Sequence, residues 1–153
     1  MSDRIPVDPN ETIARGVFSS SDYGAESRTV RFGAFLEKGL ELSVDRSDDA
    51  ALDDLVALGD MRAEQRGPHR NFHGWAVLNV AEAKRHGRRG GDGCQVWESG
   101  KAENPHHADI ELPPLPARKP IDRHLKQHAI RLARRSTWCD RSEHPTDCHE
   151  ARE

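Results

Sequence analysis

Aromatic and apolar residues are scarce in this chain: aromatics make up 5% and hydrophobic residues 35% of its 153 positions. This length supports one domain with a single, lean core. No apolar run approaches the roughly 18 residues that a membrane span requires, so we expect no membrane partner. The first ten residues lack a basic region followed by an apolar block, which predicts no secretory signal and a cytoplasmic location.

Cysteine is also rare, with only Cys94, Cys139 and Cys148 present. An odd number of cysteines without a secretory signal argues against a disulfide framework, so we expect three reduced thiols. The chain also lacks a large excess of charge, since its net charge is −3 with histidine neutral. Binding to nucleic acid or to an anionic membrane would therefore need a local patch of charge.

The chain does contain short stretches in which apolar and polar residues alternate, a pattern typical of half-buried strands. We expect strands at 13–18, 40–45, 75–80, 94–97 and 107–112. The run at 75–80 is apolar on both faces, which predicts a central strand. Apolar spacings of three and four residues predict helices at 29–36, 47–59, 79–86 and 121–138.

These elements predict an α+β fold, with a small mixed sheet of about four to five short strands packed by two to three helices and a C-terminal helix. Residues 1–11 are expected to form an extended lead-in. Residues 12–138 are expected to form a single α+β domain. Residues 139–153 have no apolar periodicity and predict a flexible tail.

The strand expected at 107–112 carries a row of ionisable side chains. His107, Asp109 and Glu111 alternate with apolar residues, so on a strand they would share one face above a buried apolar row. A histidine beside a carboxylate can serve in general acid–base catalysis. The same row is also typical of the solvent-facing side of an edge strand.

A second polar row lies on the strand expected at 40–45, where Ser43 is flanked by two acids. If the two strands were neighbours, both rows would line one surface, and Arg15 on the first strand could reach it. The candidate catalytic residues are therefore His107, Asp109, Glu111, Ser43 and Arg15.

The order of arginine, serine and acid along the chain resembles the Arg–Ser–Glu pattern of the ADP-ribosyltransferase family. Arg15 lies in Ala-Arg-Gly-Val, Ser43 in Leu-Ser-Val and Glu111 in Asp-Ile-Glu-Leu-Pro. The resemblance implies that the arginine and serine hold nicotinamide dinucleotide and that the glutamate stabilises the reacting ribose. The middle stretch lacks that family's Ser-Thr-Ser, and Asp109 stands where the family usually has Glu or Gln.

Two further clusters contain residues with suitable chemistry. Metal-ligand types occur near the end of the chain, but without the paired spacing typical of zinc sites, so we expect no metal there: Cys139, His144, Cys148 and His149. Basic residues that could contact phosphates occur in two groups. They are Lys84, Arg85, Arg88 and Arg89, followed by Arg123, Lys126, Arg131, Arg134 and Arg135.

The sequence favours a small binding or regulatory module that uses the His/Asp/Glu strand face. A small enzyme, of the ADP-ribosyltransferase type in one version, is the first alternative. Nucleic-acid binding through the basic C-terminal helix is the second. No motif identifies a cofactor, a substrate or a partner; a protein and a nucleic acid are both candidate partners.

Overall fold

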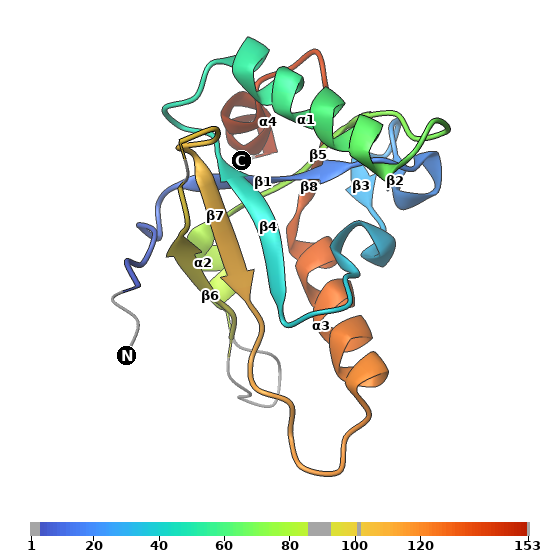
Figure 1. The fold of residues 1–153 in the computed structure, drawn as a ribbon, viewed down its shortest axis with the longest axis vertical. Coiled ribbons are helices and arrows are strands. Elements are labelled where there is room, and N and C mark those ends of the chain that lie inside the picture. The colour runs from blue at the N-terminus through green and yellow to red at the C-terminus, as the bar shows by residue number, and fades with distance from the viewer. Residues whose placement is uncertain (1–3, 86–92, 101, 153) are drawn as a thin grey trace.

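The computed structural model describes residues 4–85, 93–100 and 102–152, with side chains described up to residue 149. The chain folds into a six-stranded sheet with helices on both faces (Figure 1), which confirms the mixed α and β composition. In the described part of the chain, no helix has the length and apolar character needed to cross a membrane.

All paired strands of the sheet are antiparallel, in the order β6-β7-β4-β1-β5-β8. Their bounds are β1 (Thr12–Val17), β4 (Glu41–Arg46), β5 (Gly74–Asn79), β6 (Gln95–Glu98), β7 (His107–Glu111) and β8 (Thr137–Asp140). A separate two-stranded ribbon consists of β2 (Tyr23–Gly24) and β3 (Thr29–Val30). The predicted mixed sheet of four to five strands is therefore corrected to six antiparallel strands.

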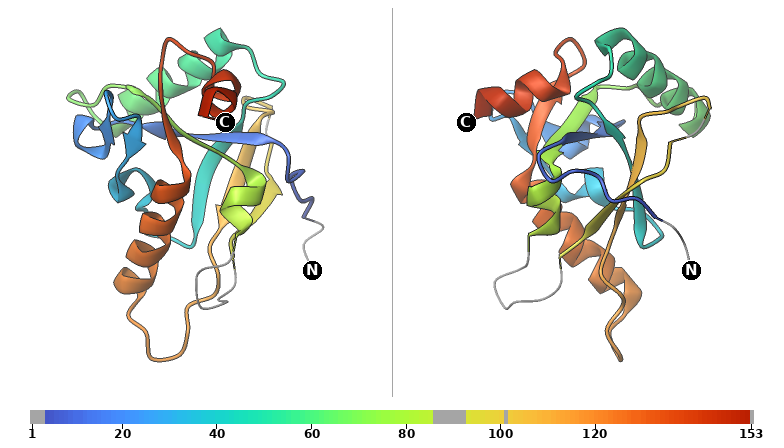
Figure 2. Two further views of the ribbon diagram at one scale, coloured as in Figure 1. Left: turned by 180° about the vertical axis from the view of Figure 1, so that it is seen from behind. Right: turned by 90° about the vertical axis from the view of Figure 1, so that its left-hand side faces the viewer.

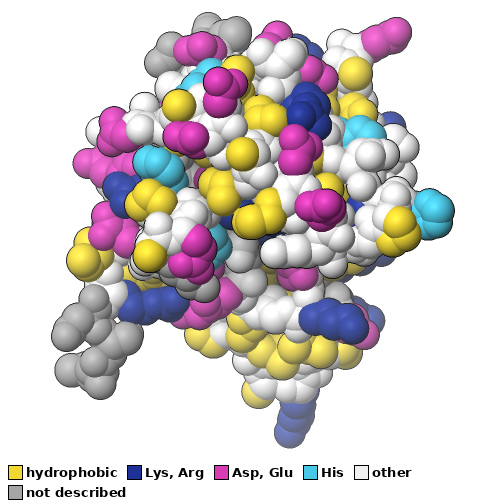
Figure 3. Space-filling model, turned by 45° about the horizontal axis from the view of Figure 1, so that its top comes forward, with side chains coloured by type: hydrophobic (Ala, Val, Ile, Leu, Met, Phe, Trp, Pro, Cys, Tyr) yellow, Lys and Arg dark blue, Asp and Glu magenta, His cyan; other side chains and the backbone are white. Residues whose placement is uncertain are grey.

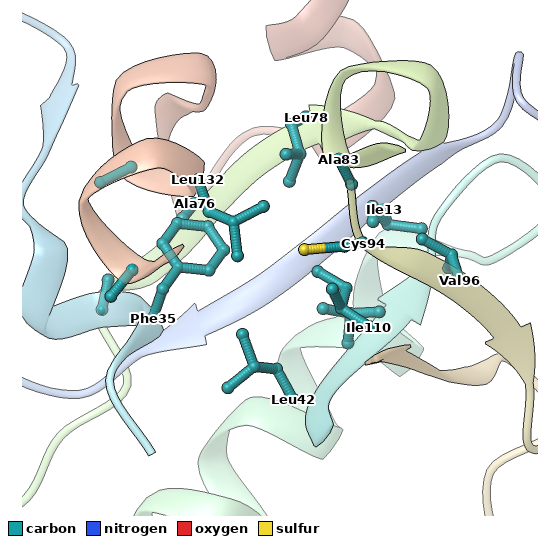
Figure 4. Packing of buried hydrophobic residues seen from close by; sticks show 14 of the residues in the cluster. Ile13, Phe35, Leu42, Ala76, Leu78, Ala83, Cys94, Val96, Ile110 and Leu132 are labelled. Atoms are coloured by element: carbon teal, nitrogen blue, oxygen red, sulfur yellow. The ribbon is translucent and has the colours of Figure 1, made fainter. Parts of the chain in front are cut away.

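The helices lie on both sides of this sheet (Figure 2). Their bounds are α1 (Leu52–Arg66), α2 (Val80–Lys84), α3 (Ile121–Arg135) and α4 (Pro145–Arg152), with short 3-10 turns η1 (Ser20–Asp22) and η2 (Phe32–Phe35). One core forms between the sheet and α2, α3 and η2 (Figure 4), and a second, smaller core forms on the opposite face beneath α1 and α4.

Strands β1 and β5 are covered on both faces, as β5 illustrates. Its first five residues are buried, and Trp75 and Val77 enter the second core while Ala76 and Leu78 enter the first. The apolar run at 75–80 is therefore an interior strand buried on both faces, as predicted, but it lies between β1 and the edge strand β8 and not at the centre of the sheet. Strands β6, β7 and β4 differ, because on the α1 side of the sheet they carry partly exposed polar residues.

Local signals placed some helix boundaries well and others poorly. Asn79 caps α2 as predicted, since its Oδ1 accepts the backbone N–H of Glu82 at 2.9 Å. Helix α1 does not end at Gly59 but continues to residue 66. A Cβ atom at Gly59 would lie 2.6 Å from the ring of Phe72, so this glycine permits a close approach and does not cap the helix. The helix predicted at 29–36 is replaced by β3 and η2.

The segment predicted to be a flexible tail contains ordered elements. Strand β8 pairs with β5, and α4 packs against β1, β5 and β8. Cys139 of β8 and Cys148 of α4 form a disulfide, which corrects the expectation that both are reduced. A strand of four residues is too short to display a clear alternation, so sequence periodicity could not reveal β8.

Candidate functional site

The stretch that suggested a site forms strand β7, as expected. Ala108 and Ile110 are fully buried in the first core, whereas His107, Asp109 and Glu111 are partly exposed on the other face. Because side chains alternate across a strand, the three ionisable groups form one row. The prediction of an extended segment with apolar groups inward and ionisable groups outward is confirmed.

The neighbouring strands place further polar groups on this face. In the antiparallel register, Asp109 lies opposite Ser43 of β4 on one side and Trp97 of β6 on the other. Glu111 lies opposite Glu41, again on β4. Paired positions point their side chains to the same face of the sheet. The structure therefore brings Ser43 next to the β7 row, as the sequence suggested for neighbouring strands.

A residue near the start of the chain also reaches this face. The segment containing Arg4 runs beside β6, where the N–H of Val7 donates to the carbonyl of Val96 at 3.0 Å and the N–H of Glu98 donates to the carbonyl of Ile5 at 2.8 Å. These bonds extend the sheet by a short additional segment at the β6 edge. The sequence predicted this lead-in to be extended, but it gave no partner for it.

The guanidinium of Arg4 sits among two carboxylates and an indole ring, which we call the Glu–Trp cage (Glu41, Glu111 and Trp97). Arg4 donates to Glu111 at 3.1 Å and to Glu41 at 3.2 Å. Its Cζ atom lies 5.5 Å from the centre of the Trp97 ring, within the range of a cation–π contact. The indole N–H of Trp97 donates to Glu111 at 3.2 Å. The cage thus binds a cation by charge and by its aromatic face.

At the other end of the β7 row, His107 does not hydrogen-bond to the acid that lies opposite it on β4. His107 pairs in register with Asp45, but the Asp45 carboxylate is buried and accepts two bonds from Arg62, at 2.7 and 3.0 Å, and one from Asn104 at 2.9 Å. His107 Nδ1 instead lies 2.6 Å from the hydroxyl of Ser99. The Asp45–Arg62 pair fixes α1 to the sheet, and the histidine is oriented by a hydroxyl rather than by a carboxylate.

Arg15 is not part of this face. It shares the first-core side of β1 with Ile13 and Val17 and is only 6% exposed. Its guanidinium donates to the carbonyls of Ala34 at 2.7 Å and Ser43 at 2.9 Å, and to Glu37 at 2.7 Å. Burial lowers the pKa of this guanidinium, and the charge of Glu37 opposes that effect. Arg15 therefore fixes η2 to the sheet.

The separation of Arg15 from the β7 row bears on the resemblance to ADP-ribosyltransferases. The resemblance implies that an arginine and a serine hold the same ligand. Here the Ser43 side chain lies on the open face, and only its backbone carbonyl meets the arginine. Four of the five predicted catalytic residues share a face, and Arg15 lies on the other.

The potential metal ligands near the end of the chain do not form a metal site among the described residues: the two cysteines form a disulfide, and His144 binds a backbone carbonyl. Sulfur atoms of Cys139 and Cys148 lie with a Glu143 oxygen within 4.8 Å of one another, but the two sulfurs form a disulfide. His144 lies outside this group, since its Nε2 donates to the carbonyl of Ala50 at 2.7 Å. A disulfide sulfur is not the thiolate that binds metal ions.

The basic residues considered for nucleic acid are spread over α2 and α3. Arg123, Lys126 and Arg134 are exposed on α3, and Arg135 donates to the carbonyl of Arg85 at 2.9 Å. Residues 88 and 89, which the sequence placed in the same patch, lie outside the described residues.

Sequence reasoning missed three residues of the polar face: Arg4, Trp97 and Ser99. Arg4 and Glu111 are 107 positions apart, so no local pattern could pair them. For Trp97 a signal was present, because the strand predicted at 94–97 ends on an indole that is followed by Glu98. We found no protein-family model, curated protein or solved structure that matches this chain.

Proposed function

We propose that this chain is a binding module that takes an extended basic segment of a protein partner on the open face of β6, β7 and β4. The observation that carries the proposal is the seating of Arg4 in the Glu–Trp cage. The chain's own arginine provides an example of the ligand, and it defines the chemistry of the site as that of a guanidinium or ammonium group.

The face keeps an excess of negative charge even with Arg4 in place. It carries three carboxylates, those of Glu41, Asp109 and Glu111, against one guanidinium. Among the described residues, Asp109 forms no salt bridge or hydrogen bond through its side chain. A partner with basic side chains at alternate positions would place them all toward this face, because alternate residues of a strand share a side.

Arg4 is held weakly enough to be replaced. Its side chain is 27% exposed, and those of Glu41 and Glu111 are 49% and 39% exposed. Exposed salt bridges contribute about 0.5 kcal/mol each. A partner that offers several basic side chains would therefore compete successfully with this single arginine.

The other functions considered from the sequence lack this kind of support. An ADP-ribosyltransferase site would need Arg15 on the same face as Ser43, and His107 has a hydroxyl partner in place of the carboxylate expected for an acid–base pair. A cytoplasmic location is the expectation from the missing secretory signal, and the Cys139–Cys148 disulfide argues against it, because disulfides are rare in cytosolic proteins. We propose a protein as the partner of the module.

The proposal is tested with a capped peptide of alternating threonine and arginine, titrated against the full chain by fluorescence anisotropy. Replacing Glu111→Gln or Glu41→Gln should weaken binding roughly threefold, and Arg4→Gln should strengthen it by a similar factor. Glu64→Gln is the matched control, because Glu64 is an exposed acid on α1 that lines a different hollow, together with Arg70 and Phe72.

Two comparisons decide the outcome. A peptide of alternating threonine and glutamate should not bind, because the face is acidic. The indole N–H resonance of Trp97 should shift on binding of the arginine peptide, since this group donates to Glu111. Equal affinities for Glu111→Gln and the Glu64→Gln control, or weaker binding by Arg4→Gln, would refute the proposal.

A further inference from the structure

Exposed apolar side chains gather at one end of the molecule, around the start of α3. Six large hydrophobic residues of the described chain are exposed by more than a third, and four of them belong to this end: Phe32, Leu36, Leu115 and Ile121. They come from η2, from the residue that follows it, from the connector at 113–120 and from the first residue of α3. The connector forms the lowest part of the molecule in Figure 1.

The structure joins Phe32, Leu36 and Ile121 into one surface. Leu36 and Ile121 line the same shallow hollow, together with Lys38 and Lys126, between η2 and the first turns of α3. The ammonium group of Lys126 lies 5.3 Å from the centre of the Phe32 ring. Apolar groups therefore occupy the middle of this surface, and lysine side chains border them.

Basic residues outnumber acids around these apolar groups. We define the tip as the four exposed apolar residues above with five basic ones: Lys38, Arg118, Lys119, Arg123 and Lys126. None of the five forms a salt bridge with a residue that the structure describes. The nearby acids are Asp122 and Glu37, and Glu37 is already bound to Arg15 at 2.7 Å. The tip thus carries a positive charge that the fold leaves uncompensated.

We propose that the tip docks on the surface of a membrane that contains anionic phospholipids. Exposed apolar side chains with a basic border match the boundary between lipid headgroups and acyl chains, where apolar groups enter to a depth of about 5–10 Å. Each lysine or arginine near such a surface adds attraction to the anionic headgroups. The contact is peripheral and uses side chains of a folded domain. It departs from our expectation of no membrane partner, which rested on the lack of an apolar run long enough to span a bilayer. It is independent of the binding function proposed for the β7 face.

The distribution of charge over the molecule gives this contact an orientation. Figure 3 shows hydrophobic side chains between Lys and Arg groups at the lower end, whereas Asp and Glu side chains are spread over the upper surface. The first turn of α1 contributes Asp53 and Asp54 to that upper end. An anionic surface would attract the tip and repel the opposite end.

A nucleic acid fits these observations less well than a lipid surface does. Phosphate contacts would use the exposed basic residues along all of α3, including Arg134 near its C-terminus. They would give no role to Leu36 and Ile121, each 45% exposed in the middle of the patch. Apolar and basic groups that act together are the property of an interfacial lipid contact.

Co-sedimentation of the full chain with phospholipid vesicles tests the proposal. We expect binding to phosphatidylcholine vesicles that contain about one third phosphatidylserine, and at least tenfold weaker binding to pure phosphatidylcholine. The double substitution Leu36→Ser with Ile121→Ser should reduce binding to the anionic vesicles about tenfold. Lys38→Gln with Lys126→Gln should reduce it by a similar factor at low salt.

Two matched controls locate the effect. Met61→Ser removes an exposed apolar side chain of similar exposure, 44%, from α1, and it should leave vesicle binding unchanged. Arg134→Gln removes an exposed charge from the other end of α3 and should reduce binding less than twofold. Far-UV circular dichroism checks that each variant is folded, which we expect because the substituted residues are all exposed.

Several results would overturn the proposal. Equal binding to neutral and anionic vesicles, or no binding to either, excludes an anionic lipid surface. Binding that falls equally with Arg134→Gln and Lys126→Gln, is unchanged by the apolar double substitution and is competed by duplex DNA would assign the basic face to nucleic acid instead.

Discussion

The buried ion pair between α1 and β4 gives the sharpest prediction about this fold. The side chain of Asp45 is 1% exposed and that of Arg62 is 23% exposed, and two hydrogen bonds join them. Replacing Arg62→Met keeps most of the side-chain volume but removes the countercharge. Asp45 then stays buried with a single donor, Asn104. We expect the free energy of unfolding to fall by about 3 kcal/mol, the lower end for a broken buried pair, because Asn104 still donates.

Replacing the other partner of the ion pair, Asp45, should lower the free energy of unfolding by less. In Asp45→Asn the arginine loses its partner, but its partial exposure lets the guanidinium turn toward water. We expect a loss of about 1–2 kcal/mol. The double variant Arg62→Met with Asp45→Asn should lose about 2 kcal/mol less than the two single losses added together, because it leaves neither charge without its partner.

Urea unfolding followed by tryptophan fluorescence measures these differences. With a slope of about 2 kcal/mol/M for a domain of this size, Arg62→Met should lower the midpoint by about 1.5 M. Arg134→Met is the control, since Arg134 is exposed on α3, and its effect should stay within about 0.5 kcal/mol. Strictly additive losses, or an Arg62→Met midpoint equal to that of the control, would refute the coupling inferred from the structure.

Two further predictions concern α3 and α1. Burial, with the nearby charge of His124, lowers the pKa of His128 from 6.5 to about 4, so the unfolded chain binds more protons between these pH values. Stability should therefore fall by about 2–3 kcal/mol as the pH drops from 6.5 to 4, and the urea midpoint of His128→Gln should depend less on pH over this range. Gly59→Ala should lower stability by about 1–3 kcal/mol despite its better helix propensity, because the new Cβ would lie 2.6 Å from the Phe72 ring. Thermal unfolding of Gly39→Ala, where the nearest atom is at 4.0 Å, serves as its control and should change little.

The polar row of the candidate site could be predicted because strand alternation is a local property. His107, Asp109 and Glu111 follow a period of two between buried neighbours, and the structure places them as that period requires. The same rule also contained the information that Arg15 faces the core, since it shares its parity with Ile13 and Val17. The prediction that Arg15 reaches the polar face conflicts with this parity and is wrong.

The occupant of the site could not be predicted in this way. Arg4 reaches Glu111 only because its segment pairs with the edge of β6, and strand pairing depends on the complete order of the sheet. The pairing of Cys139 with Cys148 likewise depends on α4 folding back onto β8. Contacts between distant positions carry no periodicity that a single sequence displays.

By itself, then, the sequence determined which residues of this protein are buried in its longer strands and helices, because a buried face imposes a spacing on neighbouring residues. Only the tertiary structure decided which strands are neighbours, which face each polar row shares, and where unpaired charge and exposed apolar groups collect. These depend on how the elements pack, and packing is settled by the free energy of the whole chain and not by any one segment.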